Sequence, residues 1–409
     1  MAKSIKNPFS EFNKRLDKLA DESKMEVELK GFSDISEYID TGNFMLNAAL
    51  TGSIFGGYPN ARSVCIAGEP STGKTFLCLN AAREAQKMGY YIMYVDTEGA
   101  IDQKDFVSFG VDLSKLRYIR LGTVSDVKFA VASAIKVIKD MKAEDPELKF
   151  MLFVDSIGQL ETGKERNDAV EGKDTSDMGL RAKQLRAAFR NFTLDLSNLK
   201  VPMIFTNHLG DDPANMYAGK KTGGGKGPEY AASTIIYLGK GTLKDGEVKT
   251  GIIVKIMIKK NRLAKPIEGI EIHISHLKGM NRYVGLQQFM SWEGCGIARG
   301  KKLNEKEFSK LSDADKAKAK PFKVGEEQFY LIESNQAKNY IIKWTGDAVP
   351  VKYLFTSQVF TKKVLEELDE NVIKPTFKYA TMSEILADEE RDLDLSGDLD
   401  EEELTENEE

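Results

Sequence analysis

Eight residues, Gly68 to Thr75 (GEPSTGKT), fit the pattern G-x-x-x-x-G-K-[ST] at every fixed position. Glycines in such a loop let backbone N–H groups converge on phosphate oxygens, and a helix that starts there adds partial positive charge. Lys74 would reach the β- and γ-phosphates, and the Thr75 hydroxyl suits Mg²⁺. The pattern therefore predicts a nucleoside triphosphate and Mg²⁺ as ligands. The residues expected to bind the nucleotide are Gly68, Glu69, Pro70, Ser71, Thr72, Gly73, Lys74, Thr75 and Phe76.

Two acidic segments follow apolar runs that are typical of buried parallel strands. Asp96-Thr97-Glu98 follows the run 90–95, and Asp155 follows the run 150–154. Ligands of open α/β sheets bind beside the carboxyl ends of the strands. Asp155 is therefore predicted as the second Mg²⁺ anchor, directly or through a water, with Ser156 as its helper. Glu98 suits the task of orienting and deprotonating water for hydrolysis; the alternative is a solvated loop carboxylate.

The elements that must position these residues surround the glycine-rich loop. The run from Val64 to Ala67 is apolar and rich in residues that favour strands. The run from Phe76 to Met88 has a helical pattern that stops at Gly89. A strand before the loop and a helix after it are the context that the motif requires, so a chance glycine-rich turn is disfavoured. We expect an α/β fold with a mainly parallel twisted sheet flanked by helices, an N-terminal helix-strand arm and a small C-terminal domain.

Two long polar segments contain the cations that best suit nucleic acid. The segment 158–177 leads into a helix that aligns three cations on one face, and the segment 209–229 contains a run of three glycines with lysines on both sides. Polar loops this long are uncommon in compact domains unless they are functional or disordered. Solvated surface cations remain the alternative. The candidate DNA-binding residues are Lys183, Arg186, Arg190, Lys220, Lys221, Gly223, Gly224, Gly225 and Lys226.

Charge is distributed unevenly along the chain. The net charge is −5, but residues 388–409 contain 13 acidic residues and one arginine, so they have a net charge of −12 and the other 387 residues have +7. A basic body suggests a polyanionic partner that competes with the acidic tail, although the tail could serve solubility alone. No apolar run approaches the roughly 20 residues needed to span a bilayer, and the first residues lack a secretory signal. We expect no membrane association and a cytoplasmic location.

Several segments together resemble the core of RecA-family recombinases. The quoted stretches are DTGNFMLNAALTGSIFGGYPNARSVCIAGEPSTGKT, YVDTEGAID, MLFVDS, SDMGLRAKQLRAAFRNF, MIFTNH, TGGGKGPEYAAS and KNRLAKPI, and they occur in the order of the family. The resemblance runs from about Gly42 to Pro266. The overall length, the acidic tail and Asn207-His208, where bacterial members have Asn-Gln, look most like T4-type phage recombinases.

The resemblance implies particular roles and partners. Glu98 would activate water, Asp102 would contact the adenine, and His208 would sense the γ-phosphate. Lys260 and Arg262 would reach the ATP of the adjacent subunit in a filament. The implied activity is DNA-dependent ATP hydrolysis with homologous pairing and strand exchange in recombination, repair and recombination-dependent replication. The implied partners are single-stranded and duplex DNA, further copies of the chain, a single-strand-binding protein and a recombination mediator, in the cytoplasm of a bacterial host.

The expected organisation has four parts: an arm (1–30) for polymerisation, an ATPase and DNA-binding core (31–286), a small C-terminal domain (287–384) and an acidic disordered tail (385–409). The arm combines helical spacing of Phe9, Phe12, Leu16 and Leu19 with strict alternation over 25–30. The segment 301–323 is rich in lysine, and we interpret it as a solvent-exposed helical face in preference to a surface that binds duplex DNA. Two other functions fit the same core: a ring-forming replicative helicase, and a DNA-coating protein whose ATP regulates affinity only.

Overall fold

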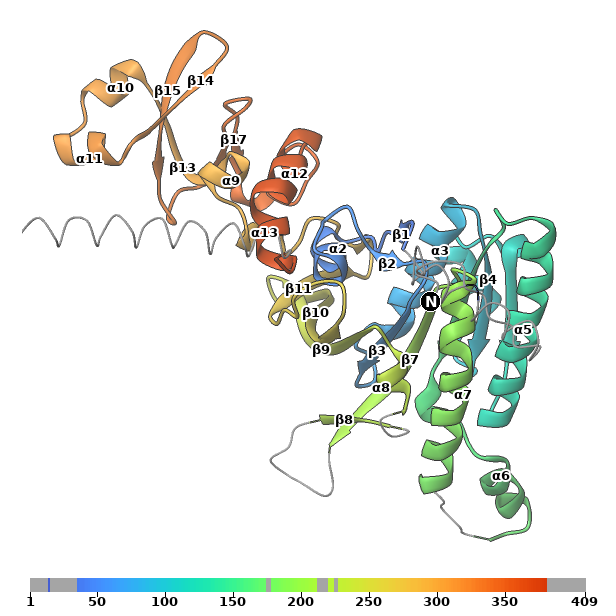
Figure 1. The fold of residues 1–409 in the computed structure, drawn as a ribbon. Helices are drawn as coiled ribbons and strands as arrows, with labels where there is room; N and C mark the ends of the chain where they lie inside the picture. Colours follow the sequence, from blue (N-terminus) through green and yellow to red (C-terminus); the bar gives the residue numbers. More distant parts are fainter. Residues whose placement is uncertain (1–13, 15–34, 174–177, 212–219, 224–226, 381–409) are drawn as a thin grey trace, which may run out of the picture. The chain divides into compact units, whose positions relative to one another are not determined.

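The computed structural model describes residues 14, 35–173, 178–211, 220–223 and 227–380 (Figure 1). The chain divides into two units, residues 1–34 and 35–409. Of the first unit only Lys14, a helical residue, is described. The expected arm, the acidic tail, and the candidate DNA-binding residues Gly224, Gly225 and Lys226 therefore lie outside the described residues.

A ten-stranded mixed sheet forms the centre of the second unit. Five neighbouring pairs, from β9 through β3, β7, β6 and β4 to β5, are parallel, and the remaining pairs are antiparallel. The α/β class with a mainly parallel sheet is thus confirmed. In spatial order the strands are β12 (Gly279–Met280), β11 (Ile270–Ser275), β10 (Val248–Asn261), β9 (Thr234–Asp245), β3 (Ser63–Gly68), β7 (Met203–Asp211), β6 (Lys149–Asp155), β4 (Tyr90–Asp96) and β5 (Leu116–Arg120), with β8 (Lys220–Thr222) paired to β7.

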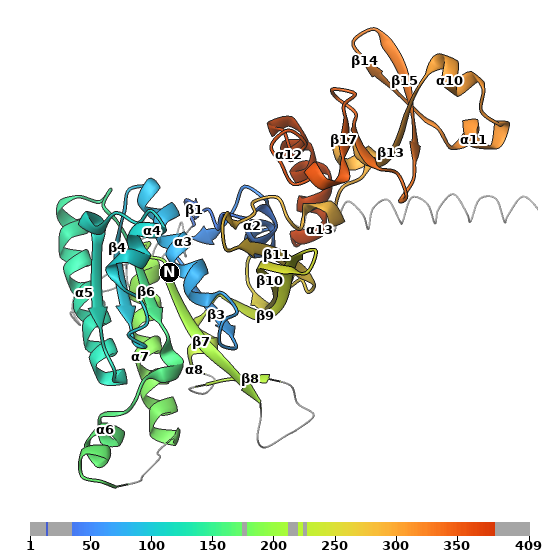
Figure 2. The ribbon, with the colours of Figure 1, turned by 180° about the vertical axis from the view of Figure 1, so that it is seen from behind.

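Helices cover both faces of this sheet because its central strands are apolar on both sides. Successive strand residues point to opposite faces, so Val64 and Ile66 pack with α3 (Lys74–Lys87), whereas Cys65 and Ala67 belong to the cluster with α5 (Val124–Glu144) and α7 (Met178–Asn198). Figures 1 and 2 show α5 and α7 along the same part of the sheet. The shorter elements are α2 (Phe44–Thr51), α4 (Gln103–Ser108), α6 (Gly163–Val170), α8 (Gly227–Ala231) and the pair β1 (Tyr38–Ile39) and β2 (Tyr58–Pro59).

Both polar segments contain more regular structure than expected. The segment 158–177 includes α6, whose N-cap Thr162 and N3 residue Glu165 form a capping box. Figures 1 and 2 place α6 beside the N-terminal end of α7. In the segment 209–229, β7 continues to Asp211 and pairs with β8 in an antiparallel hairpin, and α8 begins at Gly227. The prediction that both segments are loops throughout was wrong. A capping box in the first segment and strand pairing in the second provide hydrogen-bond partners for the backbone, and polar composition does not reveal these partners.

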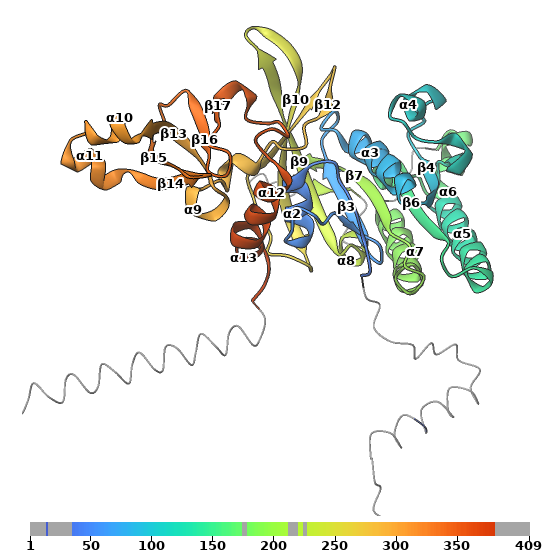
Figure 3. The same cartoon turned by 90° about the horizontal axis from the view of Figure 1, so that it is seen from above.

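A second, five-stranded antiparallel sheet follows the central one in the chain (Figure 3). The lysine-rich segment 301–323 begins in its strand β13 and ends in its strand β14, so the expected helical structure is limited to two short helices, α10 and α11, between them. Phe322 is buried with Trp292 and Leu331, and this packing outweighs the helical preference of the neighbouring Lys and Ala residues. The elements of this region are β14 (Lys320–Val324), β15 (Glu327–Glu333), β13 (Ile297–Asn304), β16 (Asn339–Ile342), β17 (Ala348–Pro350), α9 (Trp292–Cys295), α10 (Glu305–Ser309) and α11 (Asp313–Lys318).

The last described helices attach this sheet to the central unit. Asp369, which begins a single π-helical turn (Asp369–Ile373), is buried and accepts hydrogen bonds from Ser53 Oγ (2.7 Å) and the Ile54 N–H (2.7 Å) just after α2. The flanking helices are α12 (Lys362–Leu368) and α13 (Lys374–Phe377). No helix in the described part of the chain is both long and apolar enough to cross a bilayer.

Candidate functional site: the phosphate loop and the strand ends beside it

The glycine-rich loop follows β3 and is folded as a concave turn of backbone N–H groups. Ser71 and Gly73 have positive φ values of 62° and 94°, and alternation of this kind turns successive N–H groups toward one point, which suits an anion. Gly68 is required by space, since a Cβ there would lie 2.5 Å from Thr72 Oγ1. Gly73 precedes α3 and gives it no side-chain cap, so the helix N-terminus is available to a phosphate.

Lys74 is held in this loop with its ammonium over the turn. Its Nζ donates to the carbonyl oxygens of Gly68 (2.9 Å) and Glu69 (3.0 Å), and the residue is buried. Burial lowers the pKa of the Lys74 ammonium, and the carboxylates of Glu98 and Asp155 act in the opposite direction. The two partners of this buried cation are neutral carbonyl oxygens. Phosphate oxygens can replace them favourably, because a hydrogen bond from an ammonium to an anionic oxygen is stronger than one to a neutral carbonyl.

Thr75 and Asp155 meet across the end of β6. The Thr75 hydroxyl donates to Asp155 Oδ2 at 2.8 Å, as Tyr94 Oη does at 2.9 Å, while Thr206 Oγ1 donates to Oδ1. A hydroxyl and a carboxylate oxygen are hard donors that suit Mg²⁺, which usually takes few protein ligands together with substrate phosphates and water. These two residues thus fit the metal that the motif predicts. No group of three or more His, Cys, Asp or Glu residues in the described ranges is placed to hold a metal by itself.

Glu98 lies at the end of β4, beside the phosphate loop, with its side chain about one-third exposed. Its Oε1 accepts a hydrogen bond from Ser156 Oγ (2.7 Å) and lies 2.8 Å from His208 Nε2. A carboxylate that is oriented by two partners and still reachable by water has the geometry of a general base. Sequence reasoning assigned Ser156 to the metal, whereas its hydroxyl contacts Glu98. The separation of 58 residues leaves no local signal from which this contact could be predicted.

His208 and Asn207 link the site to the second polar segment. Asn207 is buried, and its Nδ2 donates to the carbonyl of Gly223 (2.8 Å), whose N–H donates to the His208 carbonyl (3.2 Å). Gly158, at the start of the first polar segment, is also close, because a Cβ there would lie 2.8 Å from the His208 ring. His208, which contacts Glu98, therefore also contacts both polar segments, at Gly158 in the first and at Gly223 in the second. Asn207 was not predicted as a functional residue.

The candidate DNA-binding cations lie on α7 and β8. Lys183, Arg186 and Arg190 are all exposed on α7, as their spacing predicted. Lys220 and Lys221 lie on β8, paired with Asp211 and Gly210 of β7. Gly227 allows α8 to approach α7 closely, since a Cβ there would lie 2.7 Å from the Cα of Arg186. α8 thus packs directly against α7 at Arg186, one of the candidate DNA-binding residues.

Lys260 and Arg262 are not near the phosphate loop of their own chain. Gly68 pairs with Leu238 of β9, whereas Lys260 pairs with Ile235 and Asn261 with Thr234, near the opposite end of β9. At about 3.3 Å a residue, this places them roughly 10–13 Å away along the strand. Lys260 Nζ donates to the Glu229 carbonyl at 3.0 Å, and burial lowers the pKa of this ammonium, with Arg262 adding to the effect. Arg262 is exposed.

Asp102 is also separate from the cluster around Glu98, since its carboxylate caps α4. It accepts hydrogen bonds from the N–H groups of Lys104 (2.7 Å) and Asp105 (3.0 Å) in a capping box. Phe76, in the first turn of α3, lines a pocket of about 480 Å³ with Phe109, Arg83 and the β11–β12 turn. Asp102 is not among the residues that line this pocket, so its expected contact with adenine stays a prediction.

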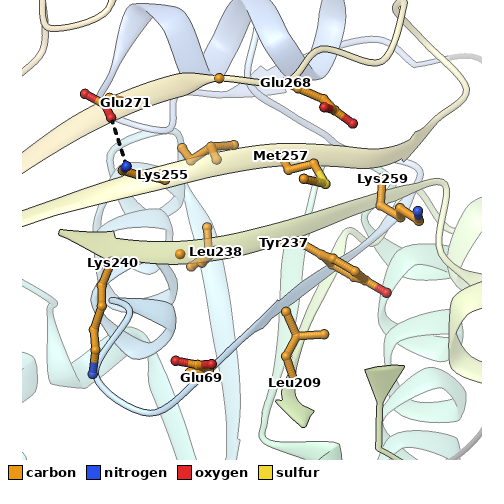
Figure 4. Close-up of a pocket in the computed structure, with 13 residues that line it drawn as sticks. Glu69, Leu209, Tyr237, Leu238, Lys240, Lys255, Met257, Lys259, Glu268 and Glu271 are labelled. Atoms are coloured by element: carbon orange, nitrogen blue, oxygen red, sulfur yellow. Dashed lines mark ion pairs between the residues drawn. The ribbon is translucent and has the colours of Figure 1, made fainter. Parts of the chain in front are cut away.

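A larger pocket of about 890 Å³ lies beside the phosphate loop on the exposed face of β9, β10 and β11 (Figure 4). Lys240 of β9 lies next to the loop that carries Glu69, and its Nζ donates to the Pro70 carbonyl at 3.1 Å. Lys255 forms an ion pair with Glu271 at 3.8 Å. Leu209, next to His208, lines the same pocket. Sequence reasoning did not identify this pocket, because its lining comes from several separate segments of the chain.

A strand followed by a phosphate loop with its lysine and threonine, with carboxylates at the ends of two further parallel strands of the same sheet, is the arrangement of a P-loop nucleoside triphosphatase. A family model described as the RecA N-terminal domain matches residues 3–281. The chain belongs to the RecA family of ATP-dependent recombinases.

The relatives agree with this membership. The chain is 29% identical over 280 residues to the "Recombination and repair protein" of Enterobacteria phage T4, which covers 68% of this chain and 69% of that protein. It is 32% identical over 253 residues to protein RecA of a Nocardioides strain, covering 61% and 68% of the two chains. It is 30% identical over 268 residues to protein RecA of Bacteroides thetaiotaomicron, covering 64% and 73%. The predicted resemblance to the T4-type phage recombinase UvsX is thus confirmed.

Proposed function

We propose that the chain polymerises on single-stranded DNA with ATP and Mg²⁺, hydrolyses the ATP with Glu98 as general base, and pairs the bound strand with homologous duplex DNA. The observation that carries the catalytic part is the position of Glu98 beside the phosphate loop, with Ser156 Oγ at 2.7 Å and His208 Nε2 at 2.8 Å. A protein that uses ATP only to regulate affinity has no need of a carboxylate oriented in this way.

The residues of the chain divide the work of hydrolysis. Backbone N–H groups of the loop and the Lys74 ammonium bind the phosphates, and Thr75 with Asp155 would hold Mg²⁺. Bound there, the ion would neutralise part of the negative charge of the phosphates. Glu98 accepts the proton of the attacking water, and the positive loop stabilises charge on the leaving group. His208, which contacts Glu98, detects the γ-phosphate and passes its presence to the second polar segment through Asn207 and Gly223.

The DNA-binding part of the proposal rests on exposed cations near the strand ends. Lys183, Arg186 and Arg190 form one exposed face on α7, which suits a phosphate backbone. The β7–β8 hairpin begins directly after His208, so Lys220 and Lys221 lie on the element that the nucleotide site controls. Gly223 belongs to the same turn, and its N–H and carbonyl are both bonded to residues 207–208.

Self-association follows from two features of the core. Lys260 and Arg262 lie toward the end of the sheet opposite their own phosphate loop. This position supports the proposal that they reach the nucleotide of another copy. β5 is the last strand of the sheet, with one edge unpaired among the described residues. Strand addition from another chain is a known association mode at such an edge, and we infer that the N-terminal arm (1–30) of a neighbouring copy binds there. Assembly would then depend on ATP, because the nucleotide lies between two subunits.

The catalytic assignment is tested by Glu98→Gln, with the exposed Glu144→Gln as a matched control. Removing the base should lower the turnover of ATP in the presence of single-stranded DNA by about 10²–10⁴-fold and leave the affinity for ATP within a few-fold. The control should keep the wild-type rate. Wild-type turnover in Glu98→Gln would remove Glu98 from this role.

Electron microscopy tests the assembly. With single-stranded DNA and a slowly hydrolysed ATP analogue, the recombinase should form helical filaments. Closed hexamers would instead support the replicative helicase.

A further inference from the structure

The backbone of the loop that carries Glu98 is fixed by one buried side chain, Asp96. Asp96 is the last residue of β4 and is 2% exposed. Its Oδ1 accepts hydrogen bonds from the N–H groups of Glu98 and Gly99, both at 2.8 Å, and its Oδ2 accepts one from Ile101 at 3.3 Å. The loop therefore turns around this carboxylate, and Gly99 allows the turn with its φ of 66°.

The second oxygen of Asp96 has a further partner on another strand. The Tyr118 hydroxyl, on the edge strand β5, lies 2.7 Å from Asp96 Oδ2 and 3.0 Å from the Ile101 carbonyl. Arg120 Nε donates to the Tyr118 oxygen at 2.9 Å. A phenol has one proton to donate, and the shorter, charge-assisted bond goes to the carboxylate. Burial raises the pKa of the Tyr118 hydroxyl, which keeps that proton in place.

These contacts hold Glu98 from the backbone side, whereas Ser156 and His208 hold its carboxylate. A reacting group displaced by about 1 Å can lose on the order of 10²-fold in rate, so the backbone position of the base affects turnover directly. Neither Asp96 nor Tyr118 belongs to the phosphate loop or the metal site described above. Their side chains reach the nucleotide site through the backbone of the loop 98–101, which carries Glu98.

We propose that Asp96 and Tyr118 are a pair of positioning residues that set the place of Glu98 for ATP hydrolysis, with the Tyr118 hydroxyl locking the Asp96 carboxylate from strand β5. This inference rests on the proposed role of Glu98 as general base. A side chain of the edge strand β5 would then affect the rate of ATP hydrolysis, although β5 contributes no residue to the phosphate loop or the metal site.

Tyr118→Phe tests the proposal with little risk to the fold. The ring of Tyr118 packs edge-on against Phe106 at 5.5 Å between centroids, and phenylalanine retains this contact. The variant removes the hydroxyl alone, whereas a change at buried Asp96 would release three backbone N–H groups. Tyr91→Phe is the matched control, because Tyr91 lies on the adjacent strand β4 with its side chain partly exposed and has no role in the site.

The decisive readouts are kcat and KM for ATP with single-stranded DNA, measured in wild type, in each single variant and in the double variant with Glu98→Gln. Tyr118→Phe should lower kcat about 3- to 20-fold, below the loss expected for a full 1 Å displacement, with KM unchanged within twofold. It should cause no further loss when Glu98 is already glutamine, because residues that act through one group are not additive. Tyr91→Phe should match wild type.

Three results would overturn the inference: an unchanged kcat in Tyr118→Phe, a raised KM with unchanged kcat, or the same fold-loss in the Glu98→Gln background as in wild type. The failure of the underlying function looks different. If Glu98→Gln alone keeps the wild-type kcat, the general-base assignment fails and this inference fails with it. If Glu98→Gln is inactive and Tyr118→Phe is fully active, the positioning role alone is wrong.

Discussion

His208 Nε2 lies 2.8 Å from Glu98 Oε1, which joins two residues that are 110 positions apart in the chain. Glu98 follows β4 and His208 belongs to β7, and β6 lies between these strands in the sheet. The contact therefore spans the end of the intervening strand, where Ser156 Oγ donates to the same oxygen of Glu98. It connects the proposed base with the hairpin that continues from β7 into the second polar segment.

The first prediction concerns this contact. His208→Ala should reduce the stimulation of ATP hydrolysis by single-stranded DNA about 5- to 150-fold, the usual range of coupling between sites, with little change in ATP affinity. His208→Gln should retain most of the stimulation, since an amide N–H can donate to Glu98. Steady-state ATPase rates with and without DNA provide the measurement. An equal loss with and without DNA would show that His208 supports the fold and not the coupling.

The second prediction concerns the metal. Thr75→Val keeps the shape of the side chain and removes the hydroxyl that donates to Asp155 Oδ2 at 2.8 Å. The Mg²⁺ concentration for half-maximal hydrolysis should rise by about tenfold. A change of this size corresponds to the binding free energy of roughly one good hydrogen bond or ligand contact. Thr242→Val, at an exposed position of β9, is the matched control. If both variants titrate with Mg²⁺ like the wild type, Thr75 does not hold the metal.

The sequence predicted those parts of the site that depend on local pattern. The phosphate loop, the strands before Asp96 and Asp155, and the helix after Thr75 each follow from spacing over short windows of about 11–18 residues. The contacts between strand ends could not be predicted in this way. Ser156 meets Glu98 and Tyr118 meets Asp96 only because of the order of β5, β4, β6 and β7 in the sheet, and neither motif nor periodicity encodes that order.

The errors outside the site have the same origin. Lys302 belongs to a strand although its surroundings are rich in helix formers, because β13 pairs with both β15 and β16. Likewise, polar residues 163–170 form a helix because a capping box supplies its first turn with partners. Strand pairing and helix capping determine the secondary structure of such segments when the intrinsic helix or strand propensity of their residues is weak.

The third prediction concerns pH. His273 lies in β11, and burial lowers its pKa below the ordinary value of about 6.5, with Glu271 opposing the effect. The unfolded chain then binds more protons than the folded one between the two pKa values, so the free energy of unfolding rises with pH in this window. The stability that neutral His273 contributes is fully present above about pH 6.5 and is lost as pH falls through the lower folded-state value.

Urea unfolding of wild type and His273→Gln between about pH 5 and 8 measures this effect. The variant should lose less stability than wild type on acidification, because glutamine does not titrate. Parallel curves for the two proteins over the whole range would contradict the assignment.

The last prediction concerns the acidic tail, residues 388–409, which lies outside the described residues. Its net charge is −12 against +7 for the rest of the chain, so it can occupy cationic surface that duplex DNA would otherwise use. Removing it should strengthen duplex binding and steepen the dependence of log K on log salt, because more phosphate contacts release more counterions. Single-strand binding should change less, since stacking and backbone contacts add to it. Titrations of full-length and truncated protein across a salt series give both quantities. Equal affinities and equal slopes would show that the tail serves solubility alone, whereas tighter binding with a steeper slope would show that it competes with DNA.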